Sequence, residues 1–196
     1  MKIVGLTGGI GSGKSTISKI LLKNDIPVYN SDKRAKLIMA DNKKLKMKIM
    51  SIYGDECFNN GKLNKEYLSK IVFGDLESNL KMNSIVHPFV HSDFMGWIKK
   101  FKKKYVVFES ALIFETGSYK NNDFNVLVTS DENKRITRIM LRDQCSEKQV
   151  KKKMKFQFND ASKTNLSDYL IYNNDFEQTK KDVYKMINFL NRKYGV

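Results

Sequence analysis

The sequence predicts a three-layer α/β fold, in which helices cover both faces of a parallel sheet, with one helical insertion. First, the apolar run at 3–6 leads into a glycine-rich loop and then a helical pattern. Second, the apolar runs at 105–108 and 124–128 have the form of strands buried on both faces of a parallel sheet. Third, the pattern between about 31 and 103 is helical after a short second strand, which predicts an insertion.

The glycine-rich loop, GGIGSGKST at 8–16, matches the pattern G-x-x-x-x-G-K-[ST]. Glycines let backbone N–H groups converge on a phosphate chain, and the helix that follows directs its positive end at the same anion. Lys14 would reach the β- and γ-phosphates, and the Ser15 hydroxyl would ligate Mg²⁺. A glycine-rich turn that merely precedes a lysine is the alternative. We favour a nucleoside triphosphate site that comprises Gly11, Ser12, Gly13, Lys14, Ser15 and Thr16.

Length and composition describe an ordinary globular chain. The 196 residues suffice for one sizeable core with a small inserted subdomain, and 41% are hydrophobic and 29% charged. No apolar run approaches the roughly 18–20 residues of a membrane span. The N-terminal residues do not resemble a signal peptide, and Cys57 and Cys145 lack partners at disulfide or metal-ligand spacing. We therefore expect a cytoplasmic protein with reduced thiols and no membrane partner.

The formal net charge of +15 has three interpretations. A run of lysines at 99–104 would suit nucleic acid, and a positive field would also attract small polyanions. The third interpretation is a lysine-rich composition on solvated helix faces. We favour the third, because lysine greatly outnumbers arginine, and so we do not expect nucleic acid as a partner.

The remaining elements follow from periodicity and capping residues. In the first half we predict helices at about 14–23 and 43–53, a strand at 26–29, and a helix capped by Ser31 or Asp32. An Asn60-Gly61 turn, a helix capped by Asn64, and separate helices at 77–86 and from Pro88 to about 103 complete the insertion. In the second half we predict helices at about 132–143 after Asp131 and at 147–158 with a capping box, a strand at 169–172, and a final helix after Asp175.

Acidic residues follow two of the predicted strands. In a parallel sheet the ligand lies at the carboxyl ends of the strands, so Asp32 would share an edge with the glycine-rich loop. A carboxylate there could act on a hydroxyl that attacks the γ-phosphate, or it could simply cap the next helix. Glu109 and Glu115 follow the strand at 105–108, where magnesium organisation, acceptor contacts and a structural ion pair are all open.

Two arginines share one face of the helix predicted at about 132–143. Arg138 and Arg142 are four residues apart, beside a basic helix, and resemble the lid of small-molecule kinases. The alternative for Arg142 is a surface cluster with Asp143.

Taken together, these motifs resemble the dephospho-coenzyme A kinases over nearly the whole chain. The resemblance rests on residues 4–16, the spacing to Asp32, and four later segments. These are Ile85-Val86-His87-Pro88, Leu112-Ile113-Phe114-Glu115, Arg138 with Arg142-Asp143, and Ile171-Tyr172 with Asn173-Asn174. Asn30, Ala111 and Asp175 depart from the family's usual Asp, Pro and Gly.

This resemblance implies a P-loop kinase-type fold and ATP-dependent phosphorylation of the ribose 3′-hydroxyl of dephospho-coenzyme A, the last step of coenzyme A synthesis. It implies a nucleotide core at 1–30 and 104–196, a lid at about 138–160 and an acceptor-binding insertion at 31–103. Carried over onto this sequence, Asp32, Lys14 and Arg142 are catalytic, and Asn173 or Asn174 lies near the adenine, with Asn174 taken as the ATP-binding residue. His87 and Glu109 are assigned to the acceptor, with ATP and Mg²⁺ as cofactors.

Two rival functions remain at this stage. Another small-molecule kinase, such as a nucleoside monophosphate kinase, would share the loop and lid. A nucleotide-dependent nucleic-acid-binding protein would use Glu109 as a hydrolytic carboxylate and would bind with a steep salt dependence. A GTPase is disfavoured because no Asn-Lys-x-Asp segment occurs. A monomer and a small homo-oligomer are both compatible with the sequence.

Overall fold

The first of two compact units contains a five-stranded parallel sheet. The structure is a computed structural model that describes residues 1–59, 61–72 and 76–195. The units are Met1–Asn30 with Lys102–Val196, and Ser31–Phe101. In sheet order the strands are β2 (Val28–Asn30), β5 (Tyr105–Glu109), β1 (Lys2–Thr7), β6 (Phe124–Thr129) and β7 (Tyr169–Tyr172). All neighbouring strands are parallel, which confirms the predicted α/β class.

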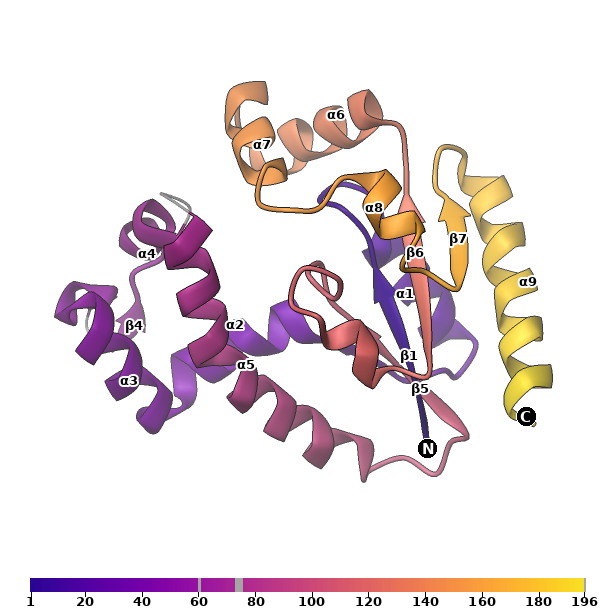
Figure 1. Cartoon of the computed structure of the whole chain (residues 1–196), viewed down its shortest axis with the longest axis horizontal. Coiled ribbons are helices and arrows are strands. Elements are labelled where there is room, and N and C mark those ends of the chain that lie inside the picture. Colours follow the sequence, from indigo (N-terminus) through magenta and orange to yellow (C-terminus); the bar gives the residue numbers. More distant parts are fainter. Residues whose placement is uncertain (60, 73–75, 196) are drawn as a thin grey trace. The chain divides into compact units, whose positions relative to one another are not determined.

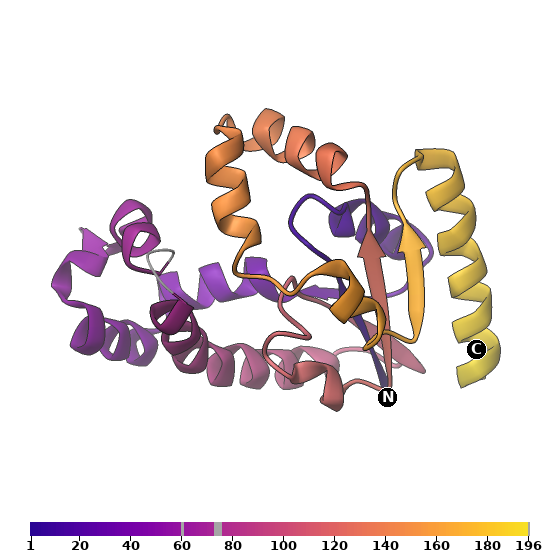
Figure 2. The same ribbon diagram turned by 45° about the horizontal axis from the view of Figure 1, so that its top comes forward.

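Helices pack on both faces of this sheet because alternate strand residues point to opposite sides. Helices α1 (Lys14–Lys23) and α9 (Phe176–Tyr194) cover one face, and α8 (Asp160–Thr164) lies over β6 on the other (Figures 1 and 2). The main core joins α1 and α9 to strand residues such as Leu6, Val126 and Val128. On the opposite face, Leu127 packs with Ile113 and Phe114 from the segment after β5.

Two further helices extend the first unit beyond the sheet. Helix α6 (Glu132–Asp143) and helix α7 (Glu147–Met154) join through Gln144, whose φ of 49° is in the left-handed region. Ile136, Ile139 and Val150 form a small core between them. The predicted capping box is confirmed, since the Ser146 and Gln149 side chains each bond the other's backbone N–H. The helix ends at Met154, earlier than the predicted 158.

The second unit is helical apart from one small hairpin. It contains α2 (Ser31–Asp41), α3 (Lys43–Tyr53), α4 (Lys65–Val72) and α5 (Leu76–Ile98), with 3-10 helix η1 (Asp55–Cys57). The hairpin pairs β3 (Phe58–Asn59) with β4 (Lys62–Leu63), and Asn60 of the predicted turn lies outside the described residues. Asn64 accepts a hydrogen bond from the N–H of Tyr67, which confirms it as a cap. Arg34 of α2 pairs with both carboxylate oxygens of Asp93 on α5.

The prediction of two helices around Pro88 was wrong, because α5 runs through this residue. Pro88 lies on the exposed side, where the carbonyl that loses its N–H partner can reach water. The buried stripe of Met82, Ile85, Val90 and Phe94 continues past it at helical spacing. Packing of one continuous apolar face therefore outweighs the local break.

Helix starts differ at two acidic positions. Helix α2 begins at Ser31, so Ser31 and Asp32 lie in its first turn rather than before it. A carboxylate there still faces the positive end of the helix. Asp131 has the predicted position before α6, but its side chain accepts from Asn174 and makes no capping bond. Asp175 caps α9 through the Gln178 N–H, as predicted.

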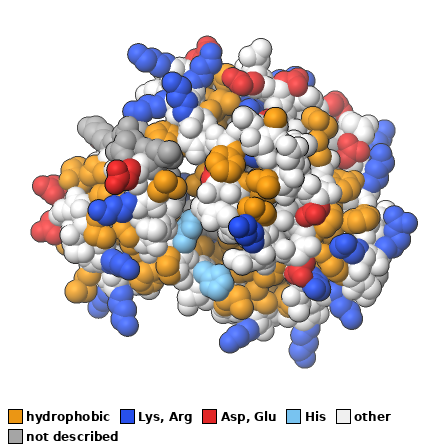
Figure 3. Space-filling model, in the orientation of Figure 1, with side chains coloured by type: hydrophobic (Ala, Val, Ile, Leu, Met, Phe, Trp, Pro, Cys, Tyr) orange, Lys and Arg blue, Asp and Glu red, His pale blue; other side chains and the backbone are white. Residues whose placement is uncertain are grey.

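The distribution of charged and apolar residues bears on the interpretation of the net charge and on membrane partners. On the face drawn in Figure 3, Lys and Arg side chains are spread widely and interspersed with Asp and Glu. Among the described residues, no helix has both the length and the apolar character needed to cross a bilayer. Both cysteines are unpaired thiols.

Candidate active site

The glycine-rich loop lies between the end of β1 and the start of α1, as the sequence predicts. Gly11 and Gly13 have φ angles of 80° and 95°, in the left-handed region that favours glycine. A Cβ on Gly13 would also overlap the side-chain nitrogen of Asn173. Asn173 is buried and donates to the Ser12 carbonyl at 2.7 Å, so it ties the loop to the end of β7.

This loop presents backbone donors to an anion. In the part of the chain that the structure describes, the N–H groups of Gly11, Gly13 and Ser15 donate to no protein acceptor. Lys14 Nζ donates to the Gly8 carbonyl at 2.8 Å, across the mouth of the loop. Converging donors at a helix N-terminus form a site for phosphate groups. The residues present therefore fit the phosphates of a nucleoside triphosphate.

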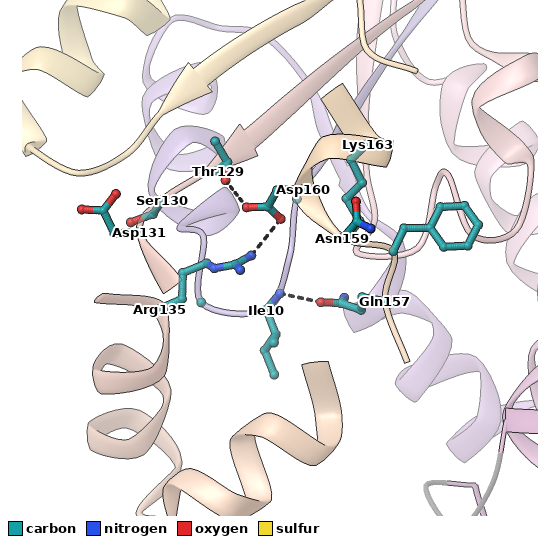
Figure 4. Close-up of polar contacts among 12 residues, drawn as sticks. Ile10, Thr129, Ser130, Asp131, Arg135, Gln157, Asn159, Asp160 and Lys163 are labelled. Atoms are coloured by element: carbon teal, nitrogen blue, oxygen red, sulfur yellow. Dashed lines mark hydrogen bonds and ion pairs between the residues drawn. The ribbon is translucent and has the colours of Figure 1, made fainter. Parts of the chain in front are cut away.

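Side chains from α6 and from the segment between α7 and α8 also contact the loop. Gln157 Oε1 accepts the N–H of Ile10 at 2.8 Å, and its Nε2 lies 3.5 Å from the Ala111 carbonyl (Figure 4). Arg135 comes so close to the loop that a Cβ on Gly9 would overlap its guanidinium. That guanidinium pairs with Asp160 at 3.1 Å, and Asp160 also accepts from the Thr129 hydroxyl (Figure 4).

A cavity of about 750 Å³ opens beside these contacts. Its walls come from the end of β6, from α6 and α7, from the start of α8 and from Tyr172. Arg135, Gln157 and Asp160 contribute to the wall nearest the loop. The cavity has equal numbers of acidic and basic side chains among its lining residues: Asp131, Glu132, Asp160, Arg135, Lys151 and Lys155.

Asn174 and Arg138 both connect the end of β7 to α6. The Asn174 side-chain oxygen accepts from the Ser130 hydroxyl and the Asp131 N–H, at 2.8 and 2.9 Å. Arg138 donates to the Asn173 carbonyl at 2.9 Å and reaches the Gly11 carbonyl at 3.4 Å. Arg138 therefore reaches the phosphate loop directly, whereas the Asn174 side chain contacts Ser130 and Asp131, just before α6.

Arg142 lies elsewhere, at the end of α6. Its guanidinium makes a bidentate pair with Asp143 at 2.7 and 3.0 Å, and its side chain is 63% exposed. The hydrogen bond that Arg142 donates to Asp143 raises the pKa of Arg142, and the same bond lowers the pKa of Asp143. In this structure Arg142 has the arrangement that the sequence offered as the alternative to a phosphate clamp.

Glu109 is the last residue of β5, the strand that pairs with β1. It is buried and accepts a hydrogen bond from Ser18 of α1 at 2.8 Å. The β-ladder aligns it with Asn30 at the end of β2 and with Leu6 of β1. Its carboxylate therefore joins the sheet to the helix that carries Lys14 and Ser15.

Asp32 and His87 belong to the second unit. Asp32 is two residues beyond the last residue of β2, in the first turn of α2. His87 lies on α5, which packs against α2. Surrounding side chains desolvate the His87 imidazole and lower its pKa, while the Asp32 carboxylate acts in the opposite direction. These two predicted site residues are therefore near enough to interact electrostatically.

Sequence reasoning missed Gln157, Arg135 and Asp160. Gln157 falls near the end of the basic helix predicted at 147–158, where nothing in the pattern separates it from other polar residues. Arg135 left a weak signal, because it stands on the apolar face of α6 beside Ile136 and Ile139. A buried arginine on such a face needs a partner, and Asp160 lies too far along the chain to be identified.

The sequence of this chain is similar to those of known proteins. The model of the family described as dephospho-CoA kinase matches residues 2–178. A dephospho-CoA kinase from Bacteroides fragilis is 31% identical over 191 residues, 97% of this chain and 93% of that protein. Another from Fusobacterium nucleatum is 34% identical over 186 residues, 94% of each chain.

Solved structures share the fold. A crystal structure from Thermus thermophilus matches with a TM-score of 0.85 and 24% identity, over 96% of each chain. The dephospho-CoA kinase from Campylobacter jejuni matches with a TM-score of 0.70 and 24% identity, over 98% of this chain and 99% of that one. With the family match and the curated relatives, the chain belongs to the dephospho-CoA kinase family, whose enzymes phosphorylate dephospho-CoA with ATP in the last step of coenzyme A biosynthesis.

Proposed function

We propose that this chain transfers the γ-phosphoryl group of ATP to the ribose 3′-hydroxyl of dephospho-CoA, with the phosphate loop as the ATP site. The loop conformation is the observation that carries this proposal. Its unpartnered N–H groups at Gly11, Gly13 and Ser15 converge at the start of α1. Donors fixed in place before ATP arrives need no reorganisation when charge moves between the phosphates.

Mg²⁺ would be held by Ser15 together with the phosphates of ATP. Within residues 1–59, 61–72 and 76–195, no three His, Cys, Asp or Glu side chains are placed to hold a metal by themselves. Mg²⁺ commonly keeps several waters and binds through few protein oxygens plus substrate phosphates, so a single hydroxyl fits this donor set. When bound, the ion would neutralise charge on the phosphate oxygens.

The transfer itself would depend on Asp32, Lys14 and Arg142. Lys14 would leave the Gly8 carbonyl and place its ammonium on the β- and γ-phosphates. Asp32 would orient the attacking 3′-hydroxyl and accept its proton. Arg142 would exchange Asp143 for the transferring phosphoryl group, a change that its exposed position at the end of α6 permits.

Acceptor binding is proposed for His87 of the second unit and for Glu109 of the first unit. Desolvation lowers the pKa of His87 and so favours the neutral imidazole, which would offer one donor and one acceptor rather than a charge. Glu109 would act from the end of β5. We place the reaction in the cytoplasm, where unpaired thiols such as Cys57 and Cys145 stay reduced.

ADP release tests this proposal most simply. The enzyme is given ATP and Mg²⁺ with dephospho-CoA, AMP, CMP, pantothenate or no acceptor. We expect release with dephospho-CoA alone. Release with AMP or CMP would indicate a nucleoside monophosphate kinase, and release without any acceptor would overturn the proposal.

A further inference from the structure

Gln157 makes a contact with the phosphate loop that none of the assigned roles uses. Its side-chain oxygen accepts the Ile10 N–H at 2.8 Å, across 147 residues of sequence. Figure 4 shows the two residues facing each other, Ile10 on the loop and Gln157 on the segment after α7. We propose that Gln157 is a positioning residue for ATP, because this hydrogen bond holds the phosphate loop in its phosphate-binding conformation. The inference rests on the proposed function.

The loop is held firmly at its other end but depends on Gln157 in its middle. Asn173 holds Ser12 through the 2.7 Å bond to its carbonyl. The Ile10 side chain packs against the small core of α6 and α7, and its backbone N–H is the group that Gln157 accepts. Residues 10 and 12 flank Gly11, so the two contacts hold the backbone on both sides of a glycine whose N–H is available to a phosphate.

Gln157 is itself fixed in orientation. Its own N–H donates to the Met154 carbonyl at 3.0 Å, which continues the turn after α7. Its side-chain nitrogen points to the Ala111 carbonyl, so the oxygen is the atom left for Ile10. The Arg135–Asp160 pair closes the space beside it, against Gly9.

This arrangement would lower the cost of ordering the loop when ATP binds. A loop already held in its bound conformation loses less conformational freedom on binding, which appears as tighter affinity. The net contribution of one neutral hydrogen bond corresponds to about a fivefold change in affinity. Removal of the contact should therefore weaken ATP binding by about fivefold.

The experiment compares Gln157→Met with Gln178→Met. Methionine keeps the length of glutamine and its packing but offers no acceptor to Ile10. Gln178 lies on α9, away from the phosphate loop, and its side-chain nitrogen donates to Asp182 at 3.0 Å, so it is a matched control. ATP affinity is measured by titration without acceptor, and KM for each substrate is measured by ADP release.

For Gln157→Met we expect a Kd and KM for ATP about fivefold higher, with the KM for dephospho-CoA and the melting temperature close to the parent's. Gln178→Met should match the parent throughout. An unchanged ATP affinity in a folded Gln157→Met would overturn the inference. The parent enzyme's own activity separates the two ideas, because an inactive parent with normal ATP affinity would count only against the proposed function.

A second measurement applies even where the methionine variant does not fold. Amide hydrogen exchange of the ATP-free parent reports directly on the Ile10 N–H. We expect this amide to be protected from exchange, because its N–H is hydrogen-bonded to the Gln157 side-chain oxygen. Exchange as fast as in an unstructured peptide would contradict the contact.

Discussion

Asn173 illustrates how single side chains hold the phosphate loop. Its nitrogen donates to Ser12, its oxygen accepts from Thr179 on α9, and its backbone carbonyl accepts from Arg138. Asn173 therefore connects the loop, β7, α9 and α6 through its side chain and its backbone carbonyl. Asn173 occupies the space that a Cβ on Gly13 would need. Any other residue at position 13 would therefore overlap Asn173, whatever its backbone conformation.

Asp32→Ala tests the proposed role of the carboxylate in phosphoryl transfer. A general base typically contributes about 10²–10⁴-fold, so we expect kcat to fall by at least about 100-fold. ATP affinity should be nearly unchanged, because ATP is assigned to the other unit. Steady-state kinetics and ATP titration provide the two readouts. Asp41→Ala, at the far end of the same helix, is the control, and unchanged turnover in Asp32→Ala would remove the assigned role.

Arg142→Ala tests whether this residue clamps the transferring group or only pairs with Asp143. A donor that acts in the transition state contributes on the order of 3 kcal/mol, so kcat/KM should fall by about two orders of magnitude. Its exposed pair with Asp143 contributes little to stability, so the melting temperature should hardly change.

The control for this variant is Arg192→Ala, in the last turn of α9. Equal kcat/KM values for Arg142→Ala and the parent would assign Arg142 to the surface pair with Asp143. Arg138, which already reaches the Gly11 carbonyl, would then be the next arginine to test.

At the scale of elements, a buried ion pair joins α8 to the segment after β5. Lys163 is fully buried and its Nζ lies 3.0 Å from Glu115 Oε1, while the Glu115 side chain is 8% exposed. The same oxygen accepts the Phe158 N–H at 2.9 Å. This pair therefore anchors the chain where it leaves the Gln157 segment.

Lys163→Met should destabilise the protein by about 3–5 kcal/mol, because it leaves the Glu115 charge buried without its partner. Adding Glu115→Gln should restore most of this loss, since glutamine can still accept from Phe158 without a charge. Urea denaturation measures both variants. Lys185→Met, which breaks an exposed pair with Asp182, should have almost no effect. A double variant as unstable as the single one would contradict the charge argument.

The whole molecule shows which features a sequence predicts well. Parallel strands with continuous apolar runs, the phosphate loop and most helices were predicted because each depends on local pattern and capping. The helix through Pro88 was missed because packing of Met82, Ile85 and Val90 prevails over a local preference. Gln157, Arg135 and Asp160 were missed because their contacts join distant segments, and no local pattern encodes a partner 25 or more residues away.

The two units have different proposed roles. Every contact described around the phosphate loop lies within the first unit, and the proposed acceptor contact at His87 lies in the second. Kinases of this class commonly close around both substrates to exclude water. Asp32, at the start of the second unit, is the residue proposed to act on the acceptor hydroxyl.

The most direct test of the central claim is the position of the phosphate in the product. The enzyme is incubated with ATP, Mg²⁺ and dephospho-CoA, and the product is analysed by mass spectrometry and ³¹P NMR. The account predicts a product heavier by one phosphate, with a new phosphomonoester on the ribose 3′-hydroxyl. A phosphate at any other position, or ADP formed without a phosphorylated product, would contradict it.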